Sequence, residues 1–111
     1  MVKRTHDDLS KQLNLLTETI INTVPVRKIF LFGSYAKGTN RDDSDIDLYI
    51  IISDNIEIRE IDVMKKIRKA IRDKKTKPVD IIVSKENNFY RRTTYPTIEQ
   101  QVIKDGKLLY G

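Results

Sequence analysis

The hydrophobic positions of this chain follow two spacings, one typical of helices and one typical of buried strands. An apolar residue recurs every three or four positions near the start, which predicts an amphipathic helix over residues 6–24. The residues that carry this pattern are Leu9, Leu13, Leu16, Ile20 and Val24. The same spacing, or a capping signal, predicts further helices over residues 34–37, from near residue 55 to 71, from a Ser84 cap to 92, and from Pro96 to Gly106.

Short apolar runs rich in β-branched residues predict three strands, over residues 29–32, 46–52 and 79–83. Residues 108–110 are expected to return to the core as an extended segment. Because helices and strands alternate along the chain, the predicted fold class is α/β (α+β), a small mixed β-sheet flanked by helices. No repeat or linker interrupts the 111 residues, which predicts a single domain over residues 1–111.

Composition argues against several classes of protein. The chain has no cysteine and one histidine, which excludes disulfides and argues against a zinc site. No apolar run approaches the ~20 residues of a membrane span, and no apolar stretch follows the basic first residues as in a signal peptide. We therefore expect a cytoplasmic protein that does not bind a membrane.

The net charge of +5 is concentrated in one short segment. Its cations are Lys65, Lys66, Arg68, Lys69, Arg72, Lys74, Lys75 and Lys77. Such a surface favours anionic partners, among them nucleotides, nucleic acid or an acidic protein. The simpler interpretation is a solvated helix face whose cations lie near the negative end of the helix dipole. Aromatic residues are few and scattered, which argues against a base-stacking platform and against direct nucleic-acid binding.

Two acids begin the second predicted strand. Asp45 and Asp47 are two residues apart, so in a strand they point to the same face and can converge on one cation. Ile46 and Leu48 would anchor the opposite face. The alternative is that Asp45 caps a turn and Asp47 lies exposed at a strand end.

A third acid lies in the third predicted strand. Asp80 stands between Val79 and Ile81, where an unpaired charge would be costly if buried. If its strand neighbours the one that carries Asp47, three carboxylates meet, an arrangement that suits two Mg²⁺ ions about 3.5–4 Å apart. Asp80 is also a candidate general base for an attacking hydroxyl. The alternative is an edge-strand acid in water.

Gly33 and Ser34 follow the first predicted strand and form a candidate phosphate site. Glycine permits close backbone approach, serine adds a hydroxyl donor, and the start of a helix exposes backbone N–H groups to an anion. Lys37 and Arg41 are candidates for neutralising a triphosphate, although both also fit exposed loop positions. The P-loop pattern is absent, and an isolated Gly-Ser pair is usually an ordinary turn.

The combination of these motifs is far more specific than any of them alone. Gly33-Ser34, a ten-residue spacer, Asp45-x-Asp47 and the later Asp80 resemble the nucleotidyltransferase superfamily of the polymerase-β type. The strings from Phe32 to Gly38 and from Ser44 to Leu48 resemble its minimal nucleotidyltransferase (MNT) branch, and the similarity runs over nearly the whole chain. Lys37 departs from the pattern, since arginine is frequent there; the charge is kept, but a bidentate guanidinium is not.

The resemblance implies a polymerase-β palm-like fold and a chemistry. Asp45 and Asp47 would bind Mg²⁺, Asp80 would complete the catalytic acids, and Gly33 and Ser34 would hold the β- and γ-phosphates of ATP. An acceptor would attack the α-phosphorus, receive AMP and release pyrophosphate. With all three acids present, we expect a competent enzyme.

The resemblance also implies a partner. Minimal proteins of this family are often paired with a helical HEPN ribonuclease as a toxin–antitoxin module, in which the MNT antitoxin transfers AMP to a tyrosine of the toxin. Three other interpretations stay open at this point. The chain could be an antitoxin that neutralises its partner sterically without catalysis, or a nucleotidyltransferase that acts on a small molecule or RNA. It could also be a basic nucleic-acid binder whose segment from Lys65 to Lys77 follows the phosphates.

Overall fold

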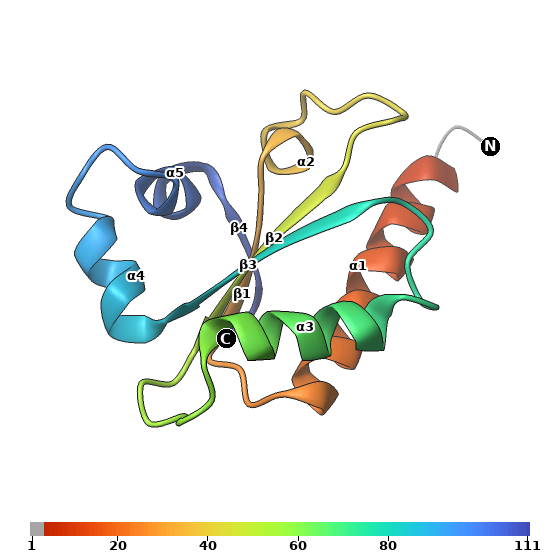
Figure 1. Cartoon of the computed structure of the whole chain (residues 1–111). Helices are drawn as coiled ribbons and strands as arrows, with labels where there is room; N and C mark the ends of the chain where they lie inside the picture. Colours follow the sequence, from red (N-terminus) through yellow and green to blue (C-terminus); the bar gives the residue numbers. More distant parts are fainter. Residues whose placement is uncertain (1–3) are drawn as a thin grey trace.

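The computed structural model describes the backbone of residues 4–111 and the side chains from residue 8 onward. Helices and strands alternate along these residues (Figure 1). In chain order they are α1 (Arg4–Thr23), β1 (Lys28–Phe32), α2 (Ser34–Lys37), β2 (Ile46–Ile52), α3 (Glu60–Ile71), β3 (Val79–Lys85), α4 (Glu86–Arg92), α5 (Ile98–Asp105) and β4 (Lys107–Tyr110). Among the described residues, no helix is both long enough and apolar enough to cross a membrane.

The four strands form one mixed sheet in the order β3-β2-β1-β4. β1 runs antiparallel to both β2 and β4, whereas β2 and β3 are parallel. β2 is the most buried strand, and Asp47 is its one residue that is not fully buried. This sheet confirms the predicted fold class and the three predicted strands, each within two residues of its expected ends.

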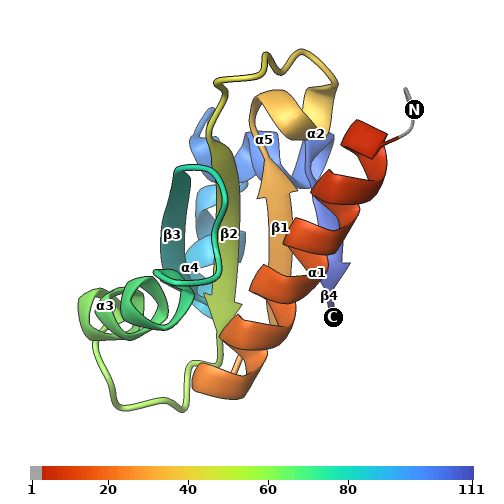
Figure 2. The same ribbon diagram turned by 90° about the vertical axis from the view of Figure 1, so that its right-hand side faces the viewer.

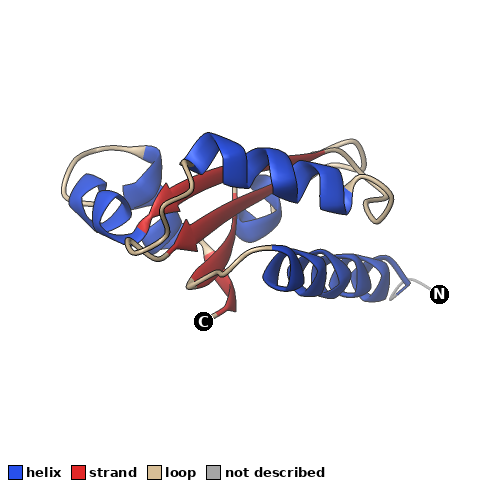
Figure 3. Ribbon diagram, turned by 60° about the horizontal axis from the view of Figure 1, so that its bottom comes forward, coloured by secondary structure: helices blue, strands red, loops and turns tan. Residues whose placement is uncertain are grey.

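Helices cover both faces of the sheet. Figure 2 shows α1 and α3 in front of the sheet and α4 and α5 behind it, and Figure 3 shows α1 and α3 as neighbours. Side chains of β2 alternate between the two sides. Leu48, Ile50 and Ile52 belong to the larger core with α1 and α3, whereas Tyr49 and Ile51 belong to a smaller core with Phe89 and Val102 of α4 and α5.

A buried glutamine fixes the loop that leads into β3. Gln12 of α1 is only 6% exposed. Its Nε2 donates to the backbone oxygen of Lys74 at 3.0 Å, and its Oε1 accepts from the hydroxyl of Thr76 at 2.9 Å and from the backbone N–H of the same residue. Because β3 starts three residues after Thr76, these bonds set the position at which Asp80 enters the sheet.

Three sequence predictions differ from the structure. Ser84 is not a helix cap, because β3 continues through it to Lys85 and α4 begins at Glu86. α3 begins at Glu60 rather than near residue 55, since the carboxylate of Asp54 instead accepts the backbone N–H of Asn87 at 3.2 Å.

The third difference concerns the last residues. The extended segment at 108–110 pairs with β1 as the edge strand β4. Leu109 packs against the larger core, but Leu108 and Tyr110 are 50% and 39% exposed. The expected return to the core therefore holds for one face of the strand only, because successive side chains of a strand point in opposite directions.

Candidate active site

Strand direction brings most of the predicted site residues to one edge of the sheet. The register pairs Phe32, the last residue of β1, with Asp47 of β2, and pairs Asp47 with Asp80 of β3. β1 therefore ends where β2 and β3 begin, at the edge that Figure 2 shows beside α2. The backbone N–H of Ile46 also donates to the carbonyl of Pro78 at 3.0 Å, which joins the starts of the two acidic strands.

Gly33 lies directly against the carboxylate of Asp47. Its φ of 74° is in the region that L side chains rarely adopt. A Cβ built on this residue would overlap Oδ2 of Asp47 and would lie 3.1 Å from its Cγ. Glycine is thus required here twice, once by the backbone angle and once by the acid that occupies the space of a side chain.

The negative charges of Asp45 and Asp80 act on the carboxyl of Asp47. Partial burial raises the pKa of the Asp47 carboxyl above its usual range, and the negative charges of Asp80 and Asp45 raise it further. Asp45 and Asp80 are exposed, whereas Asp47 is half-buried. The result is a concentration of negative charge that a divalent cation would neutralise.

The three carboxylates are suitable ligands for a hard cation, but their oxygens do not converge on one point in this structure. Carboxylate oxygens are the ligands that Mg²⁺ prefers. Among the residues whose side chains are described, no three acidic, histidine or cysteine side chains gather closely enough to hold an ion as they stand. The proximity that raises the pKa of Asp47 is the observation that favours these acids as ligands.

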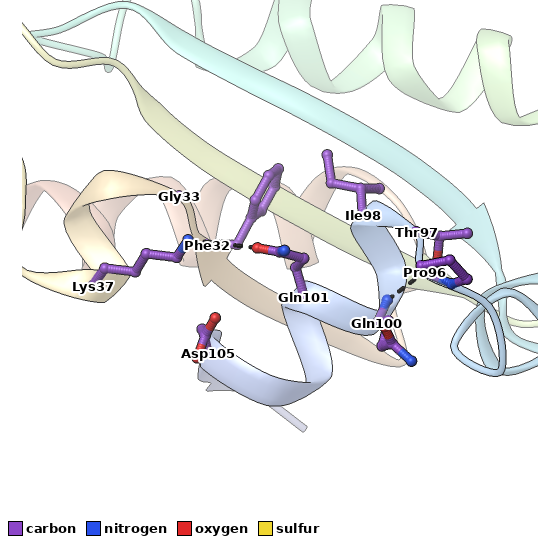
Figure 4. Close-up of a pocket in the computed structure, with 9 residues that line it drawn as sticks. All are labelled: Phe32, Gly33, Lys37, Pro96, Thr97, Ile98, Gln100, Gln101 and Asp105. Atoms are coloured by element: carbon purple, nitrogen blue, oxygen red, sulfur yellow. Dashed lines mark hydrogen bonds between the residues drawn. The ribbon is translucent and has the colours of Figure 1, made fainter.

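Ser34 and Lys37 lie in α2, directly after Gly33, at the same end of the sheet as the acids. They begin and end α2, a single turn that closes with Gly38 in the left-handed conformation. Figure 4 shows Lys37 pointing toward Gln101 of α5, and its Nζ lies 3.5 Å from Oε1 of Gln101. Lys37 and Gln101 line a cavity of about 380 Å³ together with Gly33. The other lining residues are Phe32, Pro96, Thr97, Ile98, Gln100 and Asp105.

Arg41 is not brought into that cavity. It lies in the loop between α2 and β2, where its backbone N–H donates to the hydroxyl of Ser44 at 2.7 Å. It lines a different cavity of about 320 Å³, beside Tyr35 and residues of α1. Its phosphate-binding role stays a prediction, and the structure offers it no support.

A buried polar contact behind the acids was not foreseen from the sequence. The hydroxyl of Tyr49 donates to Oε2 of Glu99 at 2.7 Å, and Nη1 of Arg92 lies 3.8 Å from the same oxygen. Burial and the hydrogen bond to Glu99 raise the pKa of Tyr49 above its usual value. Tyr49 is on the same face of β2 as Asp47, so this contact attaches α5 to the strand that carries the acid. A glutamate in an amphipathic helix carries no local signal for such a role.

The mixed sheet and its acidic edge are those of a nucleotidyltransferase domain. The family model described as "Polymerase beta, Nucleotidyltransferase" matches residues 14–111. This match spans most of the chain, which therefore belongs to the polymerase beta nucleotidyltransferase family.

Two related proteins resemble the chain over most of its length. "Protein adenylyltransferase MntA" of Shewanella oneidensis is 29% identical over 100 residues, which are 88% of this chain and 64% of that protein. The chain thus spans slightly less than two-thirds of that relative. "Putative protein adenylyltransferase MJ0604" of Methanocaldococcus jannaschii is 31% identical over 85 residues, which are 77% of this chain and 79% of that protein.

A solved structure gives the same picture. The structure described as "Crystal structure of the toxin-antitoxin with AMP-PNP" superposes with a TM-score of 0.58 at 26% identity. The superposition covers 89% of this chain and 73% of that one. The fold is therefore shared with a chain of a toxin–antitoxin structure.

Proposed function

We propose that this chain is a Mg²⁺-dependent nucleotidyltransferase that transfers AMP from ATP to a hydroxyl group of a partner protein. The observation that carries the proposal is the meeting of Gly33, Asp47 and Asp80 at one edge of the sheet. The names of the two relatives, both protein adenylyltransferases, support this choice of donor and acceptor. The absence of cysteine is compatible with action in a reducing cytoplasm.

Every candidate site residue except Arg41 has a role in this proposal. Asp45, Asp47 and Asp80 would hold the magnesium, two ions by analogy with other in-line phosphoryl-transfer sites. When bound, Mg²⁺ would offset the charge of the phosphates and of the leaving pyrophosphate. Gly33 and Ser34 hold the β- and γ-phosphates, and Lys37 adds a positive charge at the same end.

The reaction balances with these groups. The acceptor oxygen forms a bond to the α-phosphorus while the bond between that phosphorus and the bridging oxygen to the β-phosphate breaks. Asp80 accepts the proton of the acceptor hydroxyl, and pyrophosphate leaves. The products are an AMP-modified acceptor and pyrophosphate.

The partner in this proposal is a HEPN-family ribonuclease toxin, with a tyrosine as the acceptor. The likeness to a toxin–antitoxin structure that contains AMP-PNP supports a toxin partner and an adenine nucleotide. In this arrangement the chain acts as the antitoxin.

The direct experiment is incubation with labelled ATP, Mg²⁺ and the protein encoded by the neighbouring gene, followed by mass spectrometry. We expect one or more AMP adducts on a tyrosine of that protein and none with Asp45→Asn/Asp47→Asn. If the double variant still neutralises the toxin and still transfers AMP, the catalytic assignment is wrong. If it neutralises the toxin without transfer, the chain is a steric antitoxin. Adducts on RNA or on a small molecule would instead identify another acceptor.

A further inference from the structure

A basic groove lies beside the third acid, Asp80, along the outer strand β3, which is the strand farthest from β4 in the sheet. The groove has a volume of about 360 Å³ and lies between the end of α3 and the start of β3. Figure 2 shows these two elements side by side. The lining residues are Arg68, Ile71, Arg72, Lys75, Val79 and Asp80.

The groove carries three cations. Arg68 lies in the last turn of α3, Arg72 is its C-cap, and Lys75 follows in the next turn. All three are exposed, and within the described part of the chain none of their side chains makes an ion pair or a hydrogen bond. The helix dipole accounts for cations near this helix end. It does not account for three of them sharing one groove with Asp80.

The strand order gives this groove a place in the reaction. Gly33 and Ser34 follow β1, Asp47 is in β2, and Asp80 is in the edge strand β3. An in-line displacement requires the leaving group and the attacking group on opposite sides of the phosphorus. With the pyrophosphate held at the β1 side, the acceptor must approach from the β3 side. Asp80 pairs with Asp47 and so points to the face of the sheet that α4 and α5 cover, whereas the groove lies on the α3 face, so a docked segment must pass around the edge strand β3 to reach the acids.

We propose that Arg68, Arg72 and Lys75 dock an acidic segment of the acceptor protein, which passes around the edge strand β3 and presents its hydroxyl to Asp80 on the other face. This inference rests on the proposed function for the position of the acceptor. It adds that acidic residues of the acceptor lie next to the residue that is modified. Guanidinium groups bind carboxylates through paired N–H donors, so two arginines in one groove favour carboxylate recognition.

The groove fits an acidic peptide better than a single-stranded nucleic acid. Proteins that bind single strands combine basic grooves with aromatic side chains on which bases stack. The residues that line this groove include no aromatic side chain. Phe89 and Tyr90 belong to α4, which lies on the other side of the sheet (Figure 1).

The test uses the full chain and a matched pair of triple variants. The groove variant is Arg68→Gln/Arg72→Gln/Lys75→Gln, and the control is Lys66→Gln/Lys69→Gln/Lys74→Gln, which removes the same charge from exposed positions outside the groove. The probes are a fluorescent peptide with one tyrosine between glutamates, the same peptide with glutamines in their place, and a fluorescent oligoadenylate. Affinity is measured by fluorescence anisotropy, and melting curves confirm that each variant folds.

We expect the glutamate peptide to bind more tightly than the glutamine peptide, and the groove variant to lose about tenfold or more in affinity while the control loses little. Equal losses in both variants would mean diffuse attraction and would overturn the proposal. So would tighter binding of oligoadenylate than of the glutamate peptide, or no preference between the two peptides.

A second readout separates this proposal from the proposed function. With the neighbouring protein as acceptor, the groove variant should raise the KM for that protein and leave the KM for ATP unchanged. If AMP transfer occurs and the KM for the acceptor does not change, the docking groove is refuted and the enzymatic function stands. If no transfer occurs but the groove variant alone loses the glutamate peptide, the function fails and the groove stands as a binding site.

Discussion

The hydroxyl of Tyr49 in the central strand lies 2.7 Å from a carboxylate oxygen of Glu99 in α5, and both residues are buried. Arg92 reaches the same carboxylate from the end of α4. Three elements behind the acidic edge are thereby joined through one side chain. Because residues next to Glu99 line the cavity that Gly33 and Lys37 share, this contact also sets the position of the cavity wall.

Truncation of this carboxylate should destabilise the fold. We expect Glu99→Ala to lower the free energy of unfolding by about 1–3 kcal/mol, since a buried hydroxyl loses its acceptor. Lys104→Ala, an exposed position of the same helix, should change it by less than about 0.5 kcal/mol. Urea denaturation of the two variants measures the difference. Equal effects would show that the Tyr49 contact adds nothing to stability.

Two glycines with a positive φ and different surroundings provide a test of the contact with Asp47. Gly33 and Gly38 have φ values of 74° and 76°, but only a Cβ at Gly33 would meet another group, because nothing lies within 4 Å at Gly38. Gly38 has a ψ of 17° and is in the left-handed helical region, where an alanine costs roughly 1–2 kcal/mol. Gly33 has a ψ of −153°, a region nearly exclusive to glycine, where strain costs up to about 3 kcal/mol. Gly33→Ala should lose more, and it alone should abolish AMP transfer. Denaturation curves and transfer assays on both variants decide this, and similar losses would argue against the steric role of Asp47.

The raised pKa of Asp47 predicts that replacing this acid stabilises the folded protein, by an amount that depends on pH. In the metal-free protein its folded pKa lies above the ordinary value of 3.8, so the native state disfavours the charged form. The protonated carboxyl of Asp47 therefore contributes stability to the folded protein below the unfolded pKa, and this contribution is lost as the pH rises through the folded pKa. Asp47→Asn avoids this loss and should melt at a higher temperature than the parent chain at neutral pH.

The comparison requires a chelator and a series of pH values. The advantage of Asp47→Asn should shrink toward zero as the pH falls below about 4, where both forms are neutral at this position. Asp73→Asn, an exposed acid outside the site, should give no such gain. A variant that is no more stable than the parent at any pH would contradict the electrostatic account of this edge.

With metal and nucleotide bound, the parent chain should become more stable than the variants that lack the acids. Mg²⁺ with ATP binds the native state only, and at a hundredfold excess over Kd such linkage adds about 2.7 kcal/mol. We expect a clear rise in melting temperature for the parent chain, and none for Asp45→Asn/Asp47→Asn or for ATP with a chelator. Thermal shift assays measure this directly. No shift with any nucleoside triphosphate plus Mg²⁺ would count heavily against a working site.

Local patterns were sufficient for most of the secondary structure. The three- and four-residue spacing identified α1, and the β-branched runs identified β1, β2 and β3 within two residues. Predictions failed where a distant partner decided the local structure. Residues near 55 carry helix-start signals, yet Asp54 binds the backbone of Asn87, thirty-three positions further along the chain.

The sequence by itself determined which residue types this edge of the sheet carries, because glycine turns and acids at alternate strand positions follow from local spacing. That Asp80 lies beside Asp47, that Arg41 faces another cavity, and that Glu99 and the basic groove flank the acids were decided by the tertiary structure alone. Strand order and register arise from the packing of apolar faces that are far apart in sequence. A local motif therefore names the acids, and only the folded sheet sets the distances between them.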